Sequence, residues 1–162
     1  MFKTGIGYDV HILKKGLPLI VGGILISSDM GCSSHTDGDA LIHAVIDSLL
    51  GAAGKNDIGY YFPPTDNNLK GISSIKLLEK TIDIINNFKI VNIDCIVILQ
   101  APNLFPYRNK IRTCLANSCR VSLEQINIKF KTEEHLGFTG NREGIKALAT
   151  CLLEKNESFC RK

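Results

Sequence analysis

The segment from Asp39 to about Ala53 limits the possible folds of this chain most strongly, because it combines helical spacing with an apolar surface on most sides. Two adjoining faces of this helix, apolar except for Ser48, are formed by Leu41, Val45, Ser48 and Leu49 and by Ile42, Ile46, Leu49 and Ala53. A helix that is apolar over so much of its surface has to be buried under other elements. The rest of the chain must therefore supply enough apolar structure to cover it.

Stretches with strand-like spacing alternate with helical ones along the rest of the chain. The predicted strands are residues 4–11, a hairpin over 18–26 with Gly-Gly at its centre, a β-branched run over 89–100, and residues 126–132. The other predicted helices cover 73–87, 106–118 and 143–155, the last with Ile145, Leu148, Ala149, Leu152 and Leu153 on one helical face. Polar loops are predicted at 27–39 and 54–71, and the length of the second is typical of a binding loop. This order predicts an α/β (α+β) fold of two layers, in which helices cover a mixed β-sheet.

Composition and charge disfavour several classes of protein. The 162 residues, 44% hydrophobic and 22% charged, suffice for a single domain, predicted over residues 1–156, with a disordered tail over 157–162. A net charge of +3 and the lack of tryptophan do not favour nucleic-acid binding. No apolar run reaches the ~20 residues of a membrane span. No signal peptide is visible and the six cysteines show no Cys-x-x-Cys spacing, so we expect reduced thiols and a cytoplasmic protein.

Three ionisable residues form a narrow polar stripe on the apolar segment 39–53. Asp39, His43 and Asp47 are spaced at i, i+4 and i+8, so they share one side of a helix. Burying an unpaired charge costs several kcal/mol, so these groups need partners. The stripe indicates that His43 binds a ligand while its carboxylate neighbours accept a hydrogen bond from the imidazole. A core histidine with satisfied hydrogen bonds is the alternative.

A second pair of candidate ligands lies in the first predicted strand. Asp9 and His11 are two residues apart, so on a strand they point to the same face and could bind one ion. A strand that ends in a polar turn is the simpler interpretation of this pair. With His43 they form a set of two histidines and one aspartate. Three protein ligands with an open fourth position are typical of catalytic rather than structural zinc.

Six short motifs follow one another along nearly the whole chain. They are GYDVH at 7–11, HTDGDALIHA at 35–44, DIG at 57–59, FPPTD at 62–66, QAP at 100–102, and LGFTG at 136–140 followed by EGI. In order and spacing the chain resembles the 2-C-methyl-D-erythritol 2,4-cyclodiphosphate synthase family of the non-mevalonate isoprenoid (terpenoid) pathway. One such motif is weak evidence, whereas six in register are highly specific.

The resemblance implies a lyase that acts on 4-diphosphocytidyl-2-C-methyl-D-erythritol 2-phosphate. The 2-phosphate attacks the β-phosphorus of the diphosphate, which closes 2-C-methyl-D-erythritol 2,4-cyclodiphosphate and releases CMP. This reaction requires two anionic phosphates to be aligned and their charge to be spread over metals and hydrogen-bond donors. The resemblance also implies a homotrimer, with a fold like the chorismate-mutase-like trimers. In it, one subunit supplies the metal-binding face of each active site and its neighbour the cytidine pocket.

The resemblance further implies roles for individual residues. Asp9, His11 and His43 would hold one zinc ion per subunit, and Glu134 a Mg²⁺ or Mn²⁺ ion. His35 and Thr132 would be catalytic, since they would hydrogen-bond the phosphates in the transition state. The other substrate contacts would be Thr36, Asp57, Ile58, Gly59, Phe62, Asp66, Leu99, Gln100, Ala101, Pro102, Asn103, Leu104, Phe105, Phe130, Lys131, Phe138 and Asn141. For Phe138, packing between subunits is the stronger interpretation.

The chain departs from the family pattern at several positions. Pro64 stands where the family has an acidic residue, and we assign it no chemical role. Lys131 adds a positive charge near the phosphates, which Glu133 is expected to offset. Asn141 replaces an arginine that faces the central cavity of the family's trimer, and an arginine follows one position later.

Two other functions could use the same residues. A zinc-dependent phosphohydrolase of a nucleotide diphosphate would use water as the nucleophile and would need a free general base. Neither Asp37 nor Asp47 is obviously free for that task. A catalytically silent trimer would hold a structural metal in a closed site with four protein ligands, and no fourth ligand at suitable spacing is visible. The lyase is therefore the preferred hypothesis.

Overall fold

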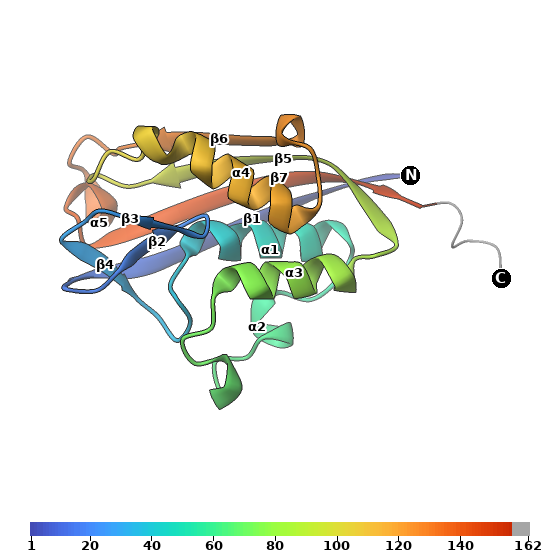
Figure 1. Cartoon of the computed structure of the whole chain (residues 1–162), viewed down its shortest axis with the longest axis horizontal. Coiled ribbons are helices and arrows are strands. Elements are labelled where there is room, and N and C mark those ends of the chain that lie inside the picture. The colour runs from blue at the N-terminus through green and yellow to red at the C-terminus, as the bar shows by residue number, and fades with distance from the viewer. Residues whose placement is uncertain (157–162) are drawn as a thin grey trace.

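The computed structural model describes residues 1–156, which form a sheet with helices packed on one face (Figure 1). Five strands make up the sheet in the order β4-β1-β7-β5-β6, and a separate hairpin pairs β2 with β3. The strands are β1 (Phe2–Lys15), β2 (Leu19–Val21), β3 (Ile24–Ile26), β4 (Met30–Ser33), β5 (Phe88–Ile98), β6 (Ile126–Lys131) and β7 (Gly144–Lys155). The helices are α1 (Ala40–Ala52), α2 (Ile58–Tyr61), α3 (Ser74–Ile84), α4 (Arg108–Cys119) and α5 (Gly137–Gly140), with short 3₁₀ helices η1 (Asn67–Leu69), η2 (Phe105–Tyr107) and η3 (Leu123–Gln125).

The predicted fold class is confirmed. β5 and β6 run parallel while the other neighbouring strands are antiparallel, so the sheet is mixed. The predicted hairpin and the other predicted strands are present, as are the first three predicted helices. The loops contain more structure than predicted, because β4 forms within 27–39, and α2 and η1 form within 54–71. The predicted tail over 157–162 lies outside the described residues.

The prediction of a helix over 143–155 is wrong, because this segment is the central strand β7. Its buried side chains alternate strictly, and they are Ile145, Ala147, Ala149, Cys151 and Leu153. The intervening Leu148 and Leu152 are also apolar, which hides this alternation and creates a helical face in the sequence. Pairing with β1 on one side and β5 on the other decides the conformation, and local spacing does not reveal such long-range partners.

Helix α1 packs directly on the backbone of β1, because glycines occupy the strand where the helix crosses it. A Cβ atom on Gly5 would lie 1.9 Å from the carbonyl oxygen of Ser48, and one on Gly7 would lie 1.9 Å from that of Ala44. On its other side α1 is covered by α3, so it lies between the sheet and that helix (Figure 1). Residues 40–46 are all buried, as the wide apolar surface of this segment requires.

The face of the sheet opposite the helices is apolar and uncovered along β1. Every second side chain of the strand points to this outer face, and the large apolar ones are Phe2, Ile6, Tyr8, Val10 and Ile12. Ile6 is 70% exposed and Ile12 63% exposed. A contiguous apolar surface of this kind is typical of an interface with another protein chain.

The five cysteines within residues 1–156 form no disulfide bond with one another. Burial raises the pKa of Cys32 and of Cys119 to about 12, so both thiols stay protonated at neutral pH. Of the helices formed by residues 1–156, none combines the length and the hydropathy needed to cross a bilayer.

Candidate active site

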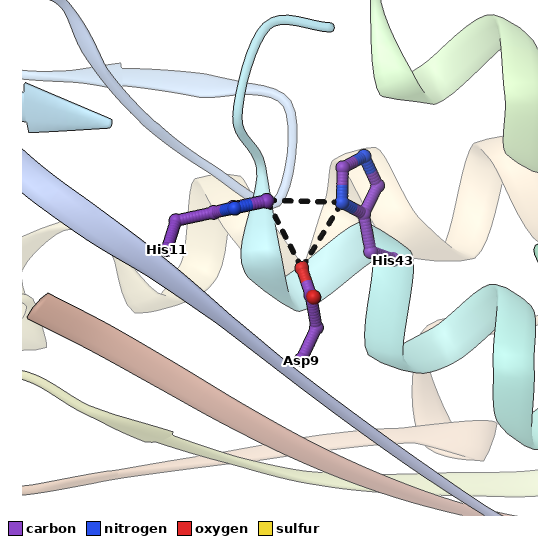
Figure 2. A group of neighbouring side chains, drawn as sticks. All are labelled: Asp9, His11 and His43. Atoms are coloured by element: carbon purple, nitrogen blue, oxygen red, sulfur yellow. Dashed lines mark hydrogen bonds and ion pairs between the residues drawn. The ribbon is translucent and has the colours of Figure 1, made fainter. Parts of the chain in front are cut away.

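Asp9, His11 and His43, the predicted zinc ligands, converge on one point between β1 and α1 (Figure 2). Alternation along β1 directs Asp9 and His11 toward the helix layer, and α1 presents His43 to them. Oδ2 of Asp9 lies 3.0 Å from Nε2 of His11 and 3.0 Å from Nδ1 of His43. The two nitrogens are 3.1 Å apart. Each side chain therefore offers one donor atom to a common centre.

Burial and the neighbouring groups act in opposite directions on the charges of this triad. Burial raises the pKa of Asp9, but the hydrogen bonds and charges of His11 and His43 outweigh it and lower the pKa to about 2. Burial lowers the pKa of His43, yet the hydrogen bond and the charge of Asp9 raise it above its ordinary value. The triad thus holds a carboxylate that stays ionised, a suitable environment for a cation.

The three donor atoms fit a zinc ion. A tetrahedral zinc with bonds of about 2.0 Å separates its ligand atoms by about 3.3 Å. The three separations in the triad, 3.0, 3.0 and 3.1 Å, are close to that value. Within residues 1–156 the group contains two histidines and one aspartate and no fourth protein ligand. Such a set leaves one position for water or a substrate oxygen, as in catalytic zinc sites.

The opposite nitrogen of His43 has partners from other parts of the chain. Nε2 lies 2.9 Å from Oγ of Ser74, the first residue of α3, and 3.2 Å from Oγ1 of Thr36. The hydroxyl of Thr36, a predicted substrate contact, thus faces the imidazole. Sequence spacing gives no signal for Ser74, because its contact with His43 depends on how α3 packs on α1.

The prediction that the carboxylates of the polar stripe accept a hydrogen bond from His43 is wrong. Asp39 caps α1 and accepts hydrogen bonds from the amides of Ile42 and of both glycines in the β2–β3 turn. Asp47 accepts a hydrogen bond from the amide of Ile58, at 2.8 Å. Free amides at helix starts and turns need acceptors, and these two carboxylates supply them.

The predicted substrate contacts between residues 57 and 66 lie around α2 and η1. Asp57 caps α2 through the amide of Tyr60, and Asp66 caps η1 through that of Asn68. Ile58 and Gly59 belong to α2, and Phe62 follows it. Nε2 of His35, a predicted catalytic group, lies 3.3 Å from the carbonyl oxygen of Asp66. The structure therefore brings this segment next to the chain that enters α1.

A cavity of about 400 Å³ opens where β5 and β6 end. It is lined by nine predicted site residues, namely Leu99, Gln100, Pro102, Asn103, Leu104, Phe130, Lys131, Thr132 and Glu134. Oγ1 of Thr132 donates a hydrogen bond to Oε1 of Glu134 at 3.0 Å, so these two predicted functional groups share one wall. Ala101 and Phe105 adjoin lining residues, and the Phe105 side chain is 71% exposed. The volume is typical of a small-molecule pocket.

Glu133 does not offset the charge of Lys131, contrary to the prediction. Its carboxylate accepts a hydrogen bond from the hydroxyl of Thr139 and pairs with the ammonium group of Lys146 on β7. The hydrogen bond with Lys146 lowers the pKa of Glu133. Lys131 lines the cavity, whereas the Glu133 side chain turns toward Lys146 on β7.

Phe138 and Asn141 lie on α5 and at its end. The Phe138 ring contacts Lys146, whose Nζ lies 5.3 Å from the ring centre, and it adjoins Glu134 beside the cavity. Asn141 is exposed, and the arginine that follows it pairs with Asp29 at 2.7 Å. These contacts give Phe138 a packing role within the chain.

The triad and the cavity belong to different parts of the sheet. β1 and α1 carry the triad, whereas the cavity lies at the ends of β5 and β6, and the two sets share no residue. β7 separates β1 from β5. Since adjacent strands are about 4.8 Å apart, the two carrying strands are about 10 Å apart. Within a single chain, the triad and the residues that line the cavity therefore form two separate groups.

Known proteins are similar to this chain in both sequence and fold. Residues 2–154 match the model of the YgbB family. The chain is 48% identical over 154 residues to the 2-C-methyl-D-erythritol 2,4-cyclodiphosphate synthase of Clostridium botulinum (strain Okra), and the match covers 94% of this chain and 99% of that protein. It is similar to the bifunctional IspDF of Campylobacter jejuni, with a TM-score of 0.92 and 36% identity over 96% of this chain and 42% of that one. It is also similar to IspF of Plasmodium falciparum in its CDP complex, with a TM-score of 0.84 and 33% identity over 96% and 97% of the two chains.

Proposed function

Because this chain belongs to the YgbB family, as its motifs predicted, we propose that it is a lyase that forms 2-C-methyl-D-erythritol 2,4-cyclodiphosphate in isoprenoid biosynthesis. Its substrate would be 4-diphosphocytidyl-2-C-methyl-D-erythritol 2-phosphate, and CMP its second product. The observation that carries this proposal is the convergence of Asp9, His11 and His43, from two family motifs, at a site that fits zinc. The CDP complex of the Plasmodium relative supports a cytidine nucleotide as the bound group.

Two metal ions belong to the proposal. Asp9, His11 and His43 would hold zinc, and Glu134 would hold Mg²⁺ or Mn²⁺. A bound zinc ion supplies positive charge that polarises a phosphate oxygen. The contribution of the chain itself is orientation, because the triad side chains are partly buried and are held by hydrogen-bond partners.

The proposed reaction exchanges one phosphorus–oxygen bond for another. An oxygen of the 2-phosphate bonds to the β-phosphorus, and the bond from that phosphorus to the oxygen bridging to the α-phosphate breaks. The bonding electron pair leaves on that oxygen as part of CMP, so no water is consumed. Lys131 and Thr132 line the cavity and would bind the phosphates there, while His35 would bind them from the triad side.

The remaining predicted contacts divide between the two parts of the substrate. The cytosine and its ribose would occupy the cavity between residues 99–105 and Phe130. The erythritol unit would contact the segment 57–66 around α2. Asn141 and Phe138 would stand at the margin of the site.

A homotrimer with shared active sites is supported by two observations. The apolar outer face of β1 is uncovered, and the triad is separated from the cavity within one chain. We expect light scattering after size exclusion to give three times the monomer mass. Ile6→Glu should dissociate the trimer, whereas Leu25→Glu, at a 67% exposed position on β3, should not. If Ile6→Glu and Leu25→Glu gave the same molar mass by light scattering, the outer face of β1 would not be the subunit interface.

Mixing two inactive variants tests whether the sites are shared. His43→Ala removes a triad ligand, and Thr132→Ala removes a cavity hydroxyl. In randomly mixed trimers, about a quarter of the sites would combine an intact triad with an intact cavity. Activity of about a quarter of the wild-type value is therefore expected after subunit exchange. If each chain held a complete site, the mixture would stay inactive.

The phosphohydrolase is not favoured. It needs a free general base near the metal, yet Asp37 accepts hydrogen bonds from Ser74 and Asp47 accepts one from the amide of Ile58. ³¹P NMR of the protein with the cytidine substrate, Zn²⁺ and Mg²⁺ distinguishes the two reactions. A cyclic diphosphate plus CMP is the expected product pair. Release of inorganic phosphate or CDP would support hydrolysis instead.

A further inference from the structure

A chain of hydrogen bonds runs from His43 through the buried Ser74 to Asp37. Oγ of Ser74 lies 2.9 Å from Nε2 of His43, and the same hydroxyl donates a hydrogen bond to Oδ1 of Asp37. The amide of Ser74 donates to Oδ2 of Asp37 at 2.8 Å. Ser74 is completely buried, His43 is 7% exposed and Asp37 is half-buried, so water has little access to the hydrogen bond between Ser74 and His43.

The direction of these hydrogen bonds follows from the number of protons. The carboxylate of Asp37 can only accept, so the single proton of the Ser74 hydroxyl is directed toward it. The lone pairs of Oγ are then left to accept a proton from Nε2 of His43. A neutral imidazole with its proton on Nε2 carries its lone pair on Nδ1, the atom that faces Asp9 and His11.

We propose that Ser74 and Asp37 are positioning residues that hold the His43 imidazole with Nε2 protonated and Nδ1 directed at the bound metal. This inference rests on the proposed metal site. It assigns to the start of α3 a part in the chemistry of a site built on β1 and α1. The family motif that contains His43 also contains Asp37, whereas Ser74 is reached only through packing.

The attachment of Asp37 makes this arrangement rigid. Both of its carboxylate oxygens are held by Ser74, and its own amide donates to the carbonyl oxygen of Ile72 at 3.2 Å. The segment before α1 and the start of α3 are thereby joined on the far side of the imidazole. Partners behind a metal-bound histidine typically change metal affinity 10- to 100-fold when they are removed.

The test compares two adjacent serines. Ser74→Ala removes the nearer of the two hydroxyls at Nε2 of His43, at 2.9 Å, and leaves that of Thr36 at 3.2 Å. Ser73→Ala removes the neighbouring hydroxyl, which makes no capping hydrogen bond. Zinc affinity of the purified proteins is measured by competition with a chromophoric chelator, and the melting temperature is measured without metal. We expect the zinc dissociation constant to rise about 10- to 100-fold in Ser74→Ala and to stay unchanged in Ser73→Ala.

A purely structural role gives a different result. In that case Ser74→Ala would lower the melting temperature of the metal-free protein and leave the zinc dissociation constant within twofold of wild type, which would overturn the inference. If wild type itself binds no zinc, the proposed metal site fails rather than the positioning role. If Ser74→Ala does not fold, a long-range ¹H–¹⁵N spectrum of zinc-loaded wild type shows which imidazole nitrogen of His43 carries the proton. A solvent-protected proton on Nε2 of His43 is expected, and zinc binding through Nε2 would refute the inference.

Discussion

Replacing Gly7 by alanine should damage both the stability of the protein and the proposed metal site. The added Cβ would lie 1.9 Å from the carbonyl oxygen of Ala44 and 2.7 Å from the amide nitrogen of Ser48. Both atoms belong to the backbone of α1, which is clamped between the sheet and α3, so neither can move alone. The helix as a whole has to lift away from β1.

The size of this effect can be worked out from the contact distances. An unstrained carbon–oxygen contact is about 3.3 Å, so α1 would have to shift by about 1.4 Å at this point. Overpacking of a core costs about 1–3 kcal/mol, and we expect about 3 kcal/mol of unfolding free energy here because the obstacle is backbone. His43 precedes Ala44 directly, so the shift also separates its Nδ1 from Asp9 and His11 on β1. A displacement of about 1 Å in an active site typically costs about 100-fold in rate, and we expect a loss of at least that size.

The assay is urea unfolding followed by far-UV circular dichroism, together with turnover of the cytidine substrate. Gly51→Ala is the matched control, because it lies on α1 and its added Cβ would meet only the carbonyl oxygen of Ile6, at 4.0 Å. That variant should be as stable as wild type or up to about 1 kcal/mol more stable, since alanine favours helix. If Gly7→Ala unfolded at the wild-type urea midpoint and kept full activity, the direct backbone contact between α1 and β1 at this position would be refuted.

Three further predictions follow from single side chains. Asp9 holds the pKa of His43 above its ordinary value, so at pH values below that pKa a zinc ion has to displace a proton from the imidazole. The zinc dissociation constant should therefore rise about tenfold for each pH unit below the pKa of His43, and it should be constant above that pKa. Asp39→Ala leaves three amides without their acceptor and should cost about 2–4 kcal/mol in urea unfolding, and a loss below 0.5 kcal/mol would contradict this role. Burial raises the pKa of Cys119 to about 12, so this thiol should not react with iodoacetamide at pH 8 in the folded protein. Mass spectrometry should find Cys119 unmodified before unfolding and alkylated after it, and rapid modification of the folded protein would contradict this prediction.

The triad could be predicted because each of its members is placed by local periodicity. Asp9 and His11 share a face through strand alternation. His43 lies on a buried, largely apolar helix, where an ionisable side chain without a partner would be energetically costly. The meeting of strand and helix was not derivable from spacing. The three residues were grouped as one ligand set on residue type, and the resemblance implied the same set; physically the contact depends on the glycines that bring α1 onto β1.

The features missed by sequence analysis all depend on contacts between distant segments. β7 has apolar residues on both faces, so only its two neighbouring strands distinguish it from a helix. Ser74 meets His43 through the packing of α3 on α1, and Glu133 meets Lys146 across to β7. In each case the sequence gives the residue type but not the partner, and the partner determines the role.

The central position of β7 has a consequence for folding during synthesis. Before this strand is made, β1 can pair only with β4 and β5 only with β6, so the sheet exists as two unconnected halves. β7 joins them, and it places Glu154 beside Phe2. Closing so long a loop is slow, because contacts between distant segments lower the folding rate. On the ribosome, the half that carries Asp9 and His43 therefore gains its neighbouring strand only after residues 144–155 have emerged, and until then that edge of β1 is open to pairing with other chains.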